Sequence, residues 1–236
     1  MREYIILNGT SSLTISGLLI QNLPPISKPK QRVEVEEIDG RDGDIVTYLG
    51  YGAYDKEFKI GLYGSYNVDE IIKYFNSEGT VIFSNEEDKY YNYKIIEQID
   101  FNKLLRFREA SVKLHVQPFK YSAEDNQKVF DIGTNTSIDI RNSGNIYSRP
   151  TLKIYGSGDI SLYLNNIQIF QIALGEQEYI TIDTVQMEAY KDTIDNLKNR
   201  LVTGNYENFK LNVGNNIISW SGSITQIEID NYSRWI

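Results

Sequence analysis

Alternation of apolar and polar residues is the strongest pattern in the first half of the chain, and it predicts β-strands. Across residues 31–38, Val33 and Val35 fall on one side of the pattern and charged residues on the other, which predicts a strand with one buried face. The segment Ile38–Gly43 follows and contains Asp-Gly twice. Glycine tolerates the left-handed backbone of tight turns. We therefore expect a hairpin in which this segment leads back into a second strand at Asp44–Leu49.

A helical period replaces the alternation after residue 66. Asn67 and Glu70 have the spacing of a capping box, and Gly79 is placed to end the helix. The apolar positions lie on one helical face, which we assign to the core: Val68, Ile71, Ile72 and Phe75. This is the one helix that the pattern predicts. A β-hairpin and a further strand follow it, at residues 80–83, 89–98 and 110–117.

The second half of the chain has short apolar stretches at intervals of about ten residues, separated by Gly and Asn turns such as Gly156–Gly158. Eight or so short strands with regular turns predict a β-sandwich or jelly roll. The predicted strands are residues 137–140, 151–155, 160–164, 169–174, 179–183, 185–190, 217–220 and 226–229. The segment Asp192–Asn208 has few strand formers, which predicts a long loop.

The length of 236 residues allows two domains of ordinary size. The most linker-like stretch is the polar run Tyr121–Gln127, so we expect domains at residues 1–125 and 126–236. The 18 tyrosines and 9 phenylalanines suit half-buried strand surfaces better than helices. The expected fold class is mainly β.

The charge is acidic, with a net value of -8 and no basic run. Binding of a phosphate backbone by counterion release and attachment to an anionic membrane are therefore not expected. No segment approaches the ~20 apolar residues that span a bilayer, and the N-terminus lacks the apolar run of a signal peptide. We expect synthesis in the cytoplasm and no membrane partner. The absence of cysteine excludes disulfides, zinc-thiolate sites and thiol nucleophiles.

Motifs for catalysis are missing. The chain has no Gly-x-Ser-x-Gly elbow and no phosphate-binding Gly-x-x-x-x-Gly-Lys-Ser/Thr loop, and its second half has no histidine for a serine triad. Carboxylate pairs for glycoside hydrolysis stay open, because 32 acids offer many pairs of unknown separation. Three adjacent acids at Glu86–Asp88 suggest calcium, but their spacing is not that of an EF-hand, and a solvated turn is the alternative. We expect a non-enzymatic protein with no cofactor and no metal site.

Two groups of residues have competing interpretations. Trp220 and Trp235 either stack on a sugar ring, as in a carbohydrate-binding module, or pack inside the sandwich. The glycine-rich segment near residue 40 is explained locally as a turn. The alternative is a subunit interface, with Arg41 making charge-assisted contacts to a neighbouring subunit. The candidate interface residues are Gly40, Arg41, Asp42 and Gly43.

Short segments follow one another in a recognisable order along nearly the whole chain. In the first domain they are residues 38–43, 79–84, 88–91 and 117–119. In the second domain they are Asn142–Asn145 with Arg149–Pro150, Tyr179–Asp183, Gly214–Trp220 and Arg234–Trp235. In order and spacing these segments resemble the distal tail protein (Dit) family of long-tailed bacteriophages.

This resemblance implies an N-terminal β-barrel-like domain related to tail-tube proteins, with one α-helix and a β-hairpin, assembled as a hexameric ring around the DNA channel. The C-terminal domain would be a galectin-like β-sandwich that serves as an attachment platform. The implied partners at the virion tail tip are a tail-tube protein, a tail-associated lysin or tail fibre, and receptor-binding or baseplate proteins. DNA would pass through the channel without being specifically bound. The chain has no room for the large carbohydrate-binding insertions of some relatives, which favours scaffolding over direct adhesion.

Overall fold

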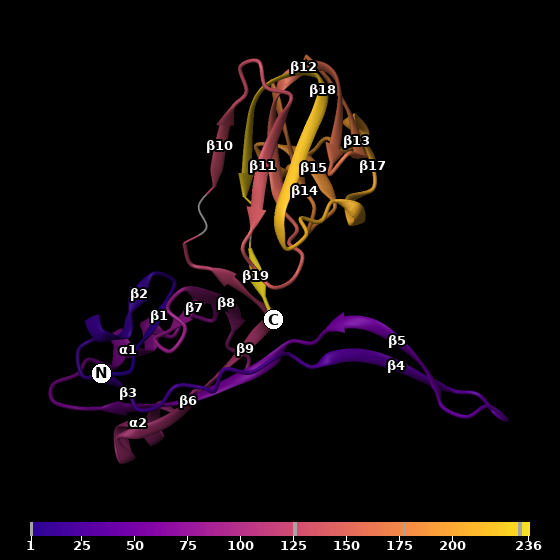
Figure 1. The fold of residues 1–236 in the computed structure, drawn as a ribbon. Coiled ribbons are helices and arrows are strands. Elements are labelled where there is room, and N and C mark those ends of the chain that lie inside the picture. Colours follow the sequence, from indigo (N-terminus) through magenta and orange to yellow (C-terminus); the bar gives the residue numbers. More distant parts are fainter. Residues whose placement is uncertain (1, 125–126, 177, 231–232) are drawn as a thin grey trace. The chain divides into compact units, whose positions relative to one another are not determined.

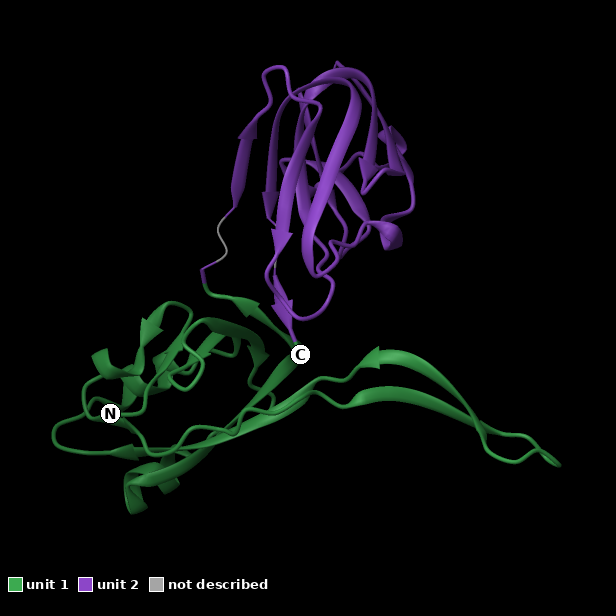
Figure 2. Cartoon of the chain, viewed as in Figure 1, with its two compact units in different colours: residues 1–123, 236 green, residues 124–235 purple. Residues whose placement is uncertain are grey.

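The computed structural model describes residues 2–124, 127–176, 178–230 and 233–236. The chain divides into two units, residues 1–123 with 236 and residues 124–235, which are coloured separately in Figure 2. Each unit has its own hydrophobic core. The boundary predicted between residues 125 and 126 lies outside the described residues. Both units are built mainly of strands, which confirms the expected fold class.

A curled, barrel-like sheet forms the body of the first unit, with strand order β2-β1-β7-β8-β9-β6-β3 (Figure 1). Alternate residues of its two long central strands are fully buried, among them Phe58 and Ile60 in β6 and Val112 and Leu114 in β9. This alternation places one face of the sheet against the core. The strands are β1 (Ile5–Leu7), β2 (Thr10–Ser11), β3 (Leu18–Ile20), β6 (Tyr54–Leu62), β7 (Glu78–Phe83), β8 (Lys89–Lys94) and β9 (Glu109–Ser122).

The predicted helix is present as α1 (Val68–Tyr74), and the Asn67 side chain caps it by accepting hydrogen bonds from the backbone N–H groups of Asp69 and Glu70. Two details of the prediction were wrong. Ile72 is exposed, whereas Tyr74, which the predicted face did not include, is buried beside Ile71 and Phe75. Gly79 lies in β7 and does not end the helix.

A second helix, α2 (Phe101–Phe107), was not predicted. Its local signal is the Asp100 carboxylate, which accepts a hydrogen bond from Lys103 N at 2.8 Å, together with the buried Leu104. Its seven residues are fewer than the roughly 11 to 18 over which a helical period is recognised, which explains why the pattern did not reveal it. In addition, a short 3-10 helix covers Ser12–Thr14.

The hairpin predicted around Ile38–Gly43 is confirmed. Strands β4 (Gln31–Glu37) and β5 (Asp44–Tyr51) pair with each other in a two-stranded sheet of their own, and we call residues 31–51 the arm (Figure 1). One expectation about it was wrong for the single chain. The alternation predicted a buried face, but every residue from 31 to 50 is exposed.

The second unit is a two-layered β-sandwich. One layer holds β10, β14, β15 and β16, the other holds β11, β13 and β17, and β12 and β18 contribute one half to each. The strands are β10 (Lys128–Asp131), β11 (Ser137–Asn142), β12 (Thr151–Leu164), β13 (Ile167–Gly175), β14 (Tyr179–Asp183), β15 (Glu188–Lys191), β16 (Thr193–Leu197), β17 (Val202–Gly204), β18 (Gly214–Asp230) and β19 (Arg234–Trp235). Two 3-10 helices cover Asn199–Leu201 and Tyr206–Asn208.

The long strands β12 and β18 correct the prediction of many short strands. Gly156 and Gly158 do not separate two strands; they lie within β12, where the pairing with β18 shifts register. A Cβ atom on Gly156 would lie 2.1 Å from Ser223 O, and one on Gly222 would lie 2.3 Å from Asp159 O. The two backbones therefore approach too closely for any side chain. Glycine lets both strands bend here and continue into the second layer.

A buried polar network in the first unit corrects the expectation of a solvated acidic turn for Glu86, while Glu87 and Asp88 are exposed as expected. Glu86 turns inward and accepts from Lys120 Nζ and from the Tyr91 hydroxyl, both at 2.7 Å. The buried Lys56 Nζ donates to Pro25 O at 2.9 Å and lies 4.8 Å from the centre of the Tyr91 ring. The network joins the loop after β7 to the segment that leads into the arm.

Lys56 makes the stability of the first unit depend on pH. Burial, with a smaller effect from the Lys120 charge, lowers the pKa of Lys56 to about 8 from its ordinary 10.5. Between these two values the unfolded chain binds more protons than the folded chain, so stability rises with pH. We expect this residue to add about 2 kcal/mol between pH 8 and pH 10. Denaturant titrations should show a smaller rise for Lys56→Met, and an equal rise in both proteins would contradict the assignment.

Candidate functional site

The arm presents an apolar face to solvent. Residues directly opposite each other in an antiparallel pair point to the same side. The register pairs Val33 with Tyr48 and Val35 with Val46, so these four side chains share one face, which we call the apolar face. Their exposed fractions are 42%, 67%, 52% and 44% in that order. A contiguous exposed apolar surface of this kind marks an interaction site.

The arm meets the barrel at its base. Gly52 N donates to Lys30 O at 2.9 Å, which continues the pairing of the arm by one step, and the Tyr51 ring meets Phe119 of β9 edge-on with ring centres 5.8 Å apart. Among the described residues, β4 and β5 pair as strands with each other alone. An isolated two-stranded hairpin is marginally stable in water. Burial of the apolar face by a partner would supply the missing stabilisation.

The predicted interface residues occupy the tip of the arm. Gly40 and Gly43 have φ angles of 80° and 79°, and Arg41 N donates to Ile38 O at 3.1 Å. These are the contacts of a tight turn, as the local interpretation predicts. Arg41 is exposed and forms no ion pair with any residue that the structure describes. Its guanidinium group is therefore available to a partner, and its contact to a second subunit stays a prediction.

The arm is also acidic, with six carboxylates and two arginines between residues 31 and 51. Glu37 and Asp44 lie directly opposite each other and extend the apolar face toward the tip. Like charges at such a pair repel. Neither carboxylate has an ion-pair partner among the described residues. An external cation beside this pair would remove the repulsion.

The tryptophans proposed for sugar contact lie in different places. Trp220 is 7% exposed and belongs to the core of the sandwich, so its ring is not available to stack on a sugar. Trp235 is half-buried on β19. The two rings therefore do not form an exposed aromatic platform, and the packing interpretation describes Trp220.

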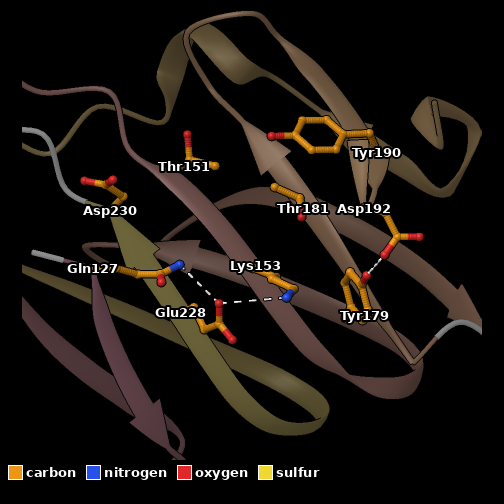
Figure 3. Close-up of a pocket in the computed structure, with 9 residues that line it drawn as sticks. All are labelled: Gln127, Thr151, Lys153, Tyr179, Thr181, Tyr190, Asp192, Glu228 and Asp230. Atoms are coloured by element: carbon orange, nitrogen blue, oxygen red, sulfur yellow. Dashed lines mark hydrogen bonds and ion pairs between the residues drawn. The ribbon is translucent and has the colours of Figure 1, made fainter. Parts of the chain in front are cut away.

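An open depression of about 240 Å³ lies over β12, β14, β15 and β18 (Figure 3). The charged groups in it bind one another. Glu228 accepts from Gln127 at 3.1 Å and lies 3.9 Å from Lys153 Nζ, while the Tyr179 hydroxyl donates to Asp192. The same Lys153 Nζ lies 4.4 Å from the centre of the Tyr179 ring and so covers one face of it. The aromatic face that a sugar would need is already in contact with a cation.

The described part of the chain contains no cluster of three or more His, Asp or Glu side chains arranged to hold a metal ion. It also contains no helix with the length and apolar character to cross a bilayer.

Comparison with known proteins gives one informative result. No protein-family model and no curated protein matches the chain. A solved structure, the SPP1 Dit protein, described as a paradigm of the hub adsorption apparatus in phages that infect Gram-positive bacteria, aligns with a TM-score of 0.65. The alignment covers 98% of this chain and 99% of that one at 14% identity. The chain has the Dit fold.

A chain of the phage P2 baseplate in its activated conformation also aligns, at 13% identity over 97% of both chains with a TM-score of 0.49. The Dit fold confirms the barrel-like first domain and the β-sandwich that the sequence resemblance implied. The sequence did not identify Val46 and Tyr48 as part of a functional surface. The register of the predicted hairpin could have identified them, because a hairpin centred on Ile38–Gly43 places Val46 and Tyr48 beside Val33 and Val35.

Proposed function

We propose that the protein is a structural hub of a bacteriophage tail tip, in which six copies form a ring through their first units. The observation that supports this proposal most directly is the apolar face of the arm, which is exposed in the single chain and needs a partner surface. The Dit fold over nearly the whole chain supports the same function, since the SPP1 protein with this fold is described as part of an adsorption hub. The protein has no catalytic role and uses no cofactor in this proposal.

The ring joins the tail tube on one side to tail-tip components on the other, namely a tail-associated lysin or fibre and receptor-binding or baseplate proteins. The second unit is the attachment platform for these partners. DNA passes through the ring and is not held there, which agrees with the net charge of -8. The burial of Trp220 and the cation over Tyr179 leave the carbohydrate-binding alternative without support.

Light scattering on the purified protein tests the ring directly. Six copies of the 27.2 kDa chain give a particle of about 163 kDa, and negative-stain images should show rings. A protein that stays monomeric at high micromolar concentration and binds no tail component would refute the proposal.

Arg41→Ala tests the tip of the arm. We expect the variant to fold as the natural protein does, because Arg41 is exposed and only its backbone contributes to the turn. Loss of a charge-assisted contact should raise the concentration needed for assembly by roughly fivefold to tenfold. Concentration-dependent light scattering measures this shift, and Lys73→Ala on the exposed side of α1 serves as the control. If assembly is unchanged, the segment around Arg41 is only a turn.

A further inference from the structure

A second exposed surface of the first unit lies at the end of β6 that is remote from the arm. β6 begins at Tyr54, close after the arm, and ends at Leu62, whose N–H donates to Arg108 O at 3.2 Å. Nine residues of strand separate the two ends by roughly 26 Å. Helix α2 lies at this remote end, away from β4 and β5 (Figure 1).

Three exposed arginines stack on aromatic rings at this end. The pairs, with the distance from the guanidinium carbon to the ring centre, are Arg2 on Tyr63 at 4.7 Å, Arg108 on Tyr66 at 4.9 Å and Arg106 on Phe107 at 5.2 Å. We call these six residues the arginine end. None of the three arginines forms an ion pair within the described chain. Arg2 donates to the Tyr63 hydroxyl at 3.1 Å and to Leu18 O at 2.9 Å, whereas the guanidinium groups of Arg106 and Arg108 have no acceptor among the described residues. Arg106 and Arg108 therefore keep an N–H edge free to bind a carboxylate in bidentate fashion.

The arginine end also offers apolar surface. Phe107 is 63% exposed, and Leu105, the residue after the buried Leu104, is exposed as well. Apolar side chains therefore lie beside unpaired cations here, whereas on the arm an apolar face lies beside the unpaired carboxylates of Glu37 and Asp44. The two surfaces match in both respects, and aromatic and arginine side chains are the types enriched in interface cores.

We propose that the arm of one copy docks on the arginine end of the next copy. The apolar face packs on Phe107 and Leu105, and Glu37 and Asp44 pair with Arg106 and Arg108. This inference rests on the proposed ring and names the receiving surface. The arms do not pair with each other, since each is acidic and would repel a second.

The location of the two surfaces explains why a ring, and not a two-fold dimer, results. An interface between different patches on opposite ends of a subunit is heterologous, and repetition of such a contact closes into a ring when the rotation between subunits allows it. The arm and the arginine end lie at opposite ends of β6, so each copy gives its arm to one neighbour and receives the arm of the other. Each ring would then contain as many arm contacts as subunits.

Exchange of the charges tests the proposal on the full-length protein. One variant carries Glu37→Lys and Asp44→Lys, a second carries Arg106→Glu and Arg108→Glu, and a third combines all four changes. We expect each of the first two to need at least about tenfold more protein for assembly, measured by light scattering. The combined variant and a 1:1 mixture of the first two should assemble again, because every arm then meets an end of opposite charge. Lys73→Glu with Arg200→Glu changes two exposed cations elsewhere and should assemble normally.

The outcomes separate this inference from the proposed function. If the natural protein forms rings and the Arg106/Arg108 variant assembles equally well, the arm docks elsewhere and the ring remains. If both variants lose assembly but neither the mixture nor the combined variant recovers it, the two surfaces do not pair with each other. If the natural protein itself forms no ring, the proposed function fails. Circular dichroism melting confirms that each variant is folded before its assembly is scored.

Discussion

Glu86→Ala should lower the free energy of unfolding of the first unit by about 3–5 kcal/mol, because it leaves the buried Lys120 ammonium without its counter-charge. The Tyr91 hydroxyl loses its acceptor in the same change. For a unit of this size the melting temperature should fall by roughly 10 °C or more. Calorimetry or denaturant unfolding measures the effect.

The neighbouring Glu87 provides a matched control. It lies in the same loop and has the same charge, but it is exposed and only accepts a hydrogen bond from the Tyr4 hydroxyl. Glu87→Ala should cost less than about 1 kcal/mol. Replacing both partners, as Glu86→Leu with Lys120→Met, should recover much of the loss, since apolar groups of similar volume remove the unpaired charge. Equal effects of the two single changes would show that Glu86 is not a structural ion-pair partner.

Val35→Asp with Val46→Asp should abolish assembly at micromolar concentration without unfolding the first unit. The two valines face each other on the apolar face and contribute nothing to the core of the barrel. Placing two carboxylates there removes the apolar contact and adds charge that must be desolvated on binding. We expect association to weaken by at least about 100-fold, measured by light scattering or analytical ultracentrifugation.

The opposite face of the arm supplies the control. Ile45 and Thr47 lie on that face, one position along β5 from the apolar face. Ile45→Asp with Thr47→Asp adds the same two charges to the same strand pair, and it should weaken assembly much less. A loss as large as that of the valine variant would mean that added charge, and not the loss of the apolar face, prevents assembly.

The sequence predicted most strands correctly because their alternation is local. Residues 31–37 and 110–117 show the period of two residues that a pleated strand requires, and the structure has strands in both segments. Glycine gave a less specific signal. In Gly156–Gly158 the same residues suit a turn between strands and a bend within one, and only the approach of Ser223 O to Gly156 distinguishes them.

Contacts between distant segments account for the other differences. Glu86 lies in an acidic loop, so the sequence predicted a solvated side chain. Its partner Lys120 comes 34 residues later, and a local pattern does not reveal a contact over that distance. The exposed arm is a different case. Alternation indicates that one face of a strand prefers to be buried, yet it does not say whether the burying surface belongs to the same chain. In the arm, the single chain leaves that preference unmet, which marks this face as a candidate interaction site.

The two bent strands of the sandwich have a mechanical consequence. Because β12 and β18 each run through both layers, neither layer can peel away without breaking hydrogen bonds in the other. The second unit should therefore yield as one body under tension, with no partly opened state in which a single layer is lost. A pull on β12 or β18 is shared between the two layers, because the backbones of these strands approach closely at Gly156 and Gly222.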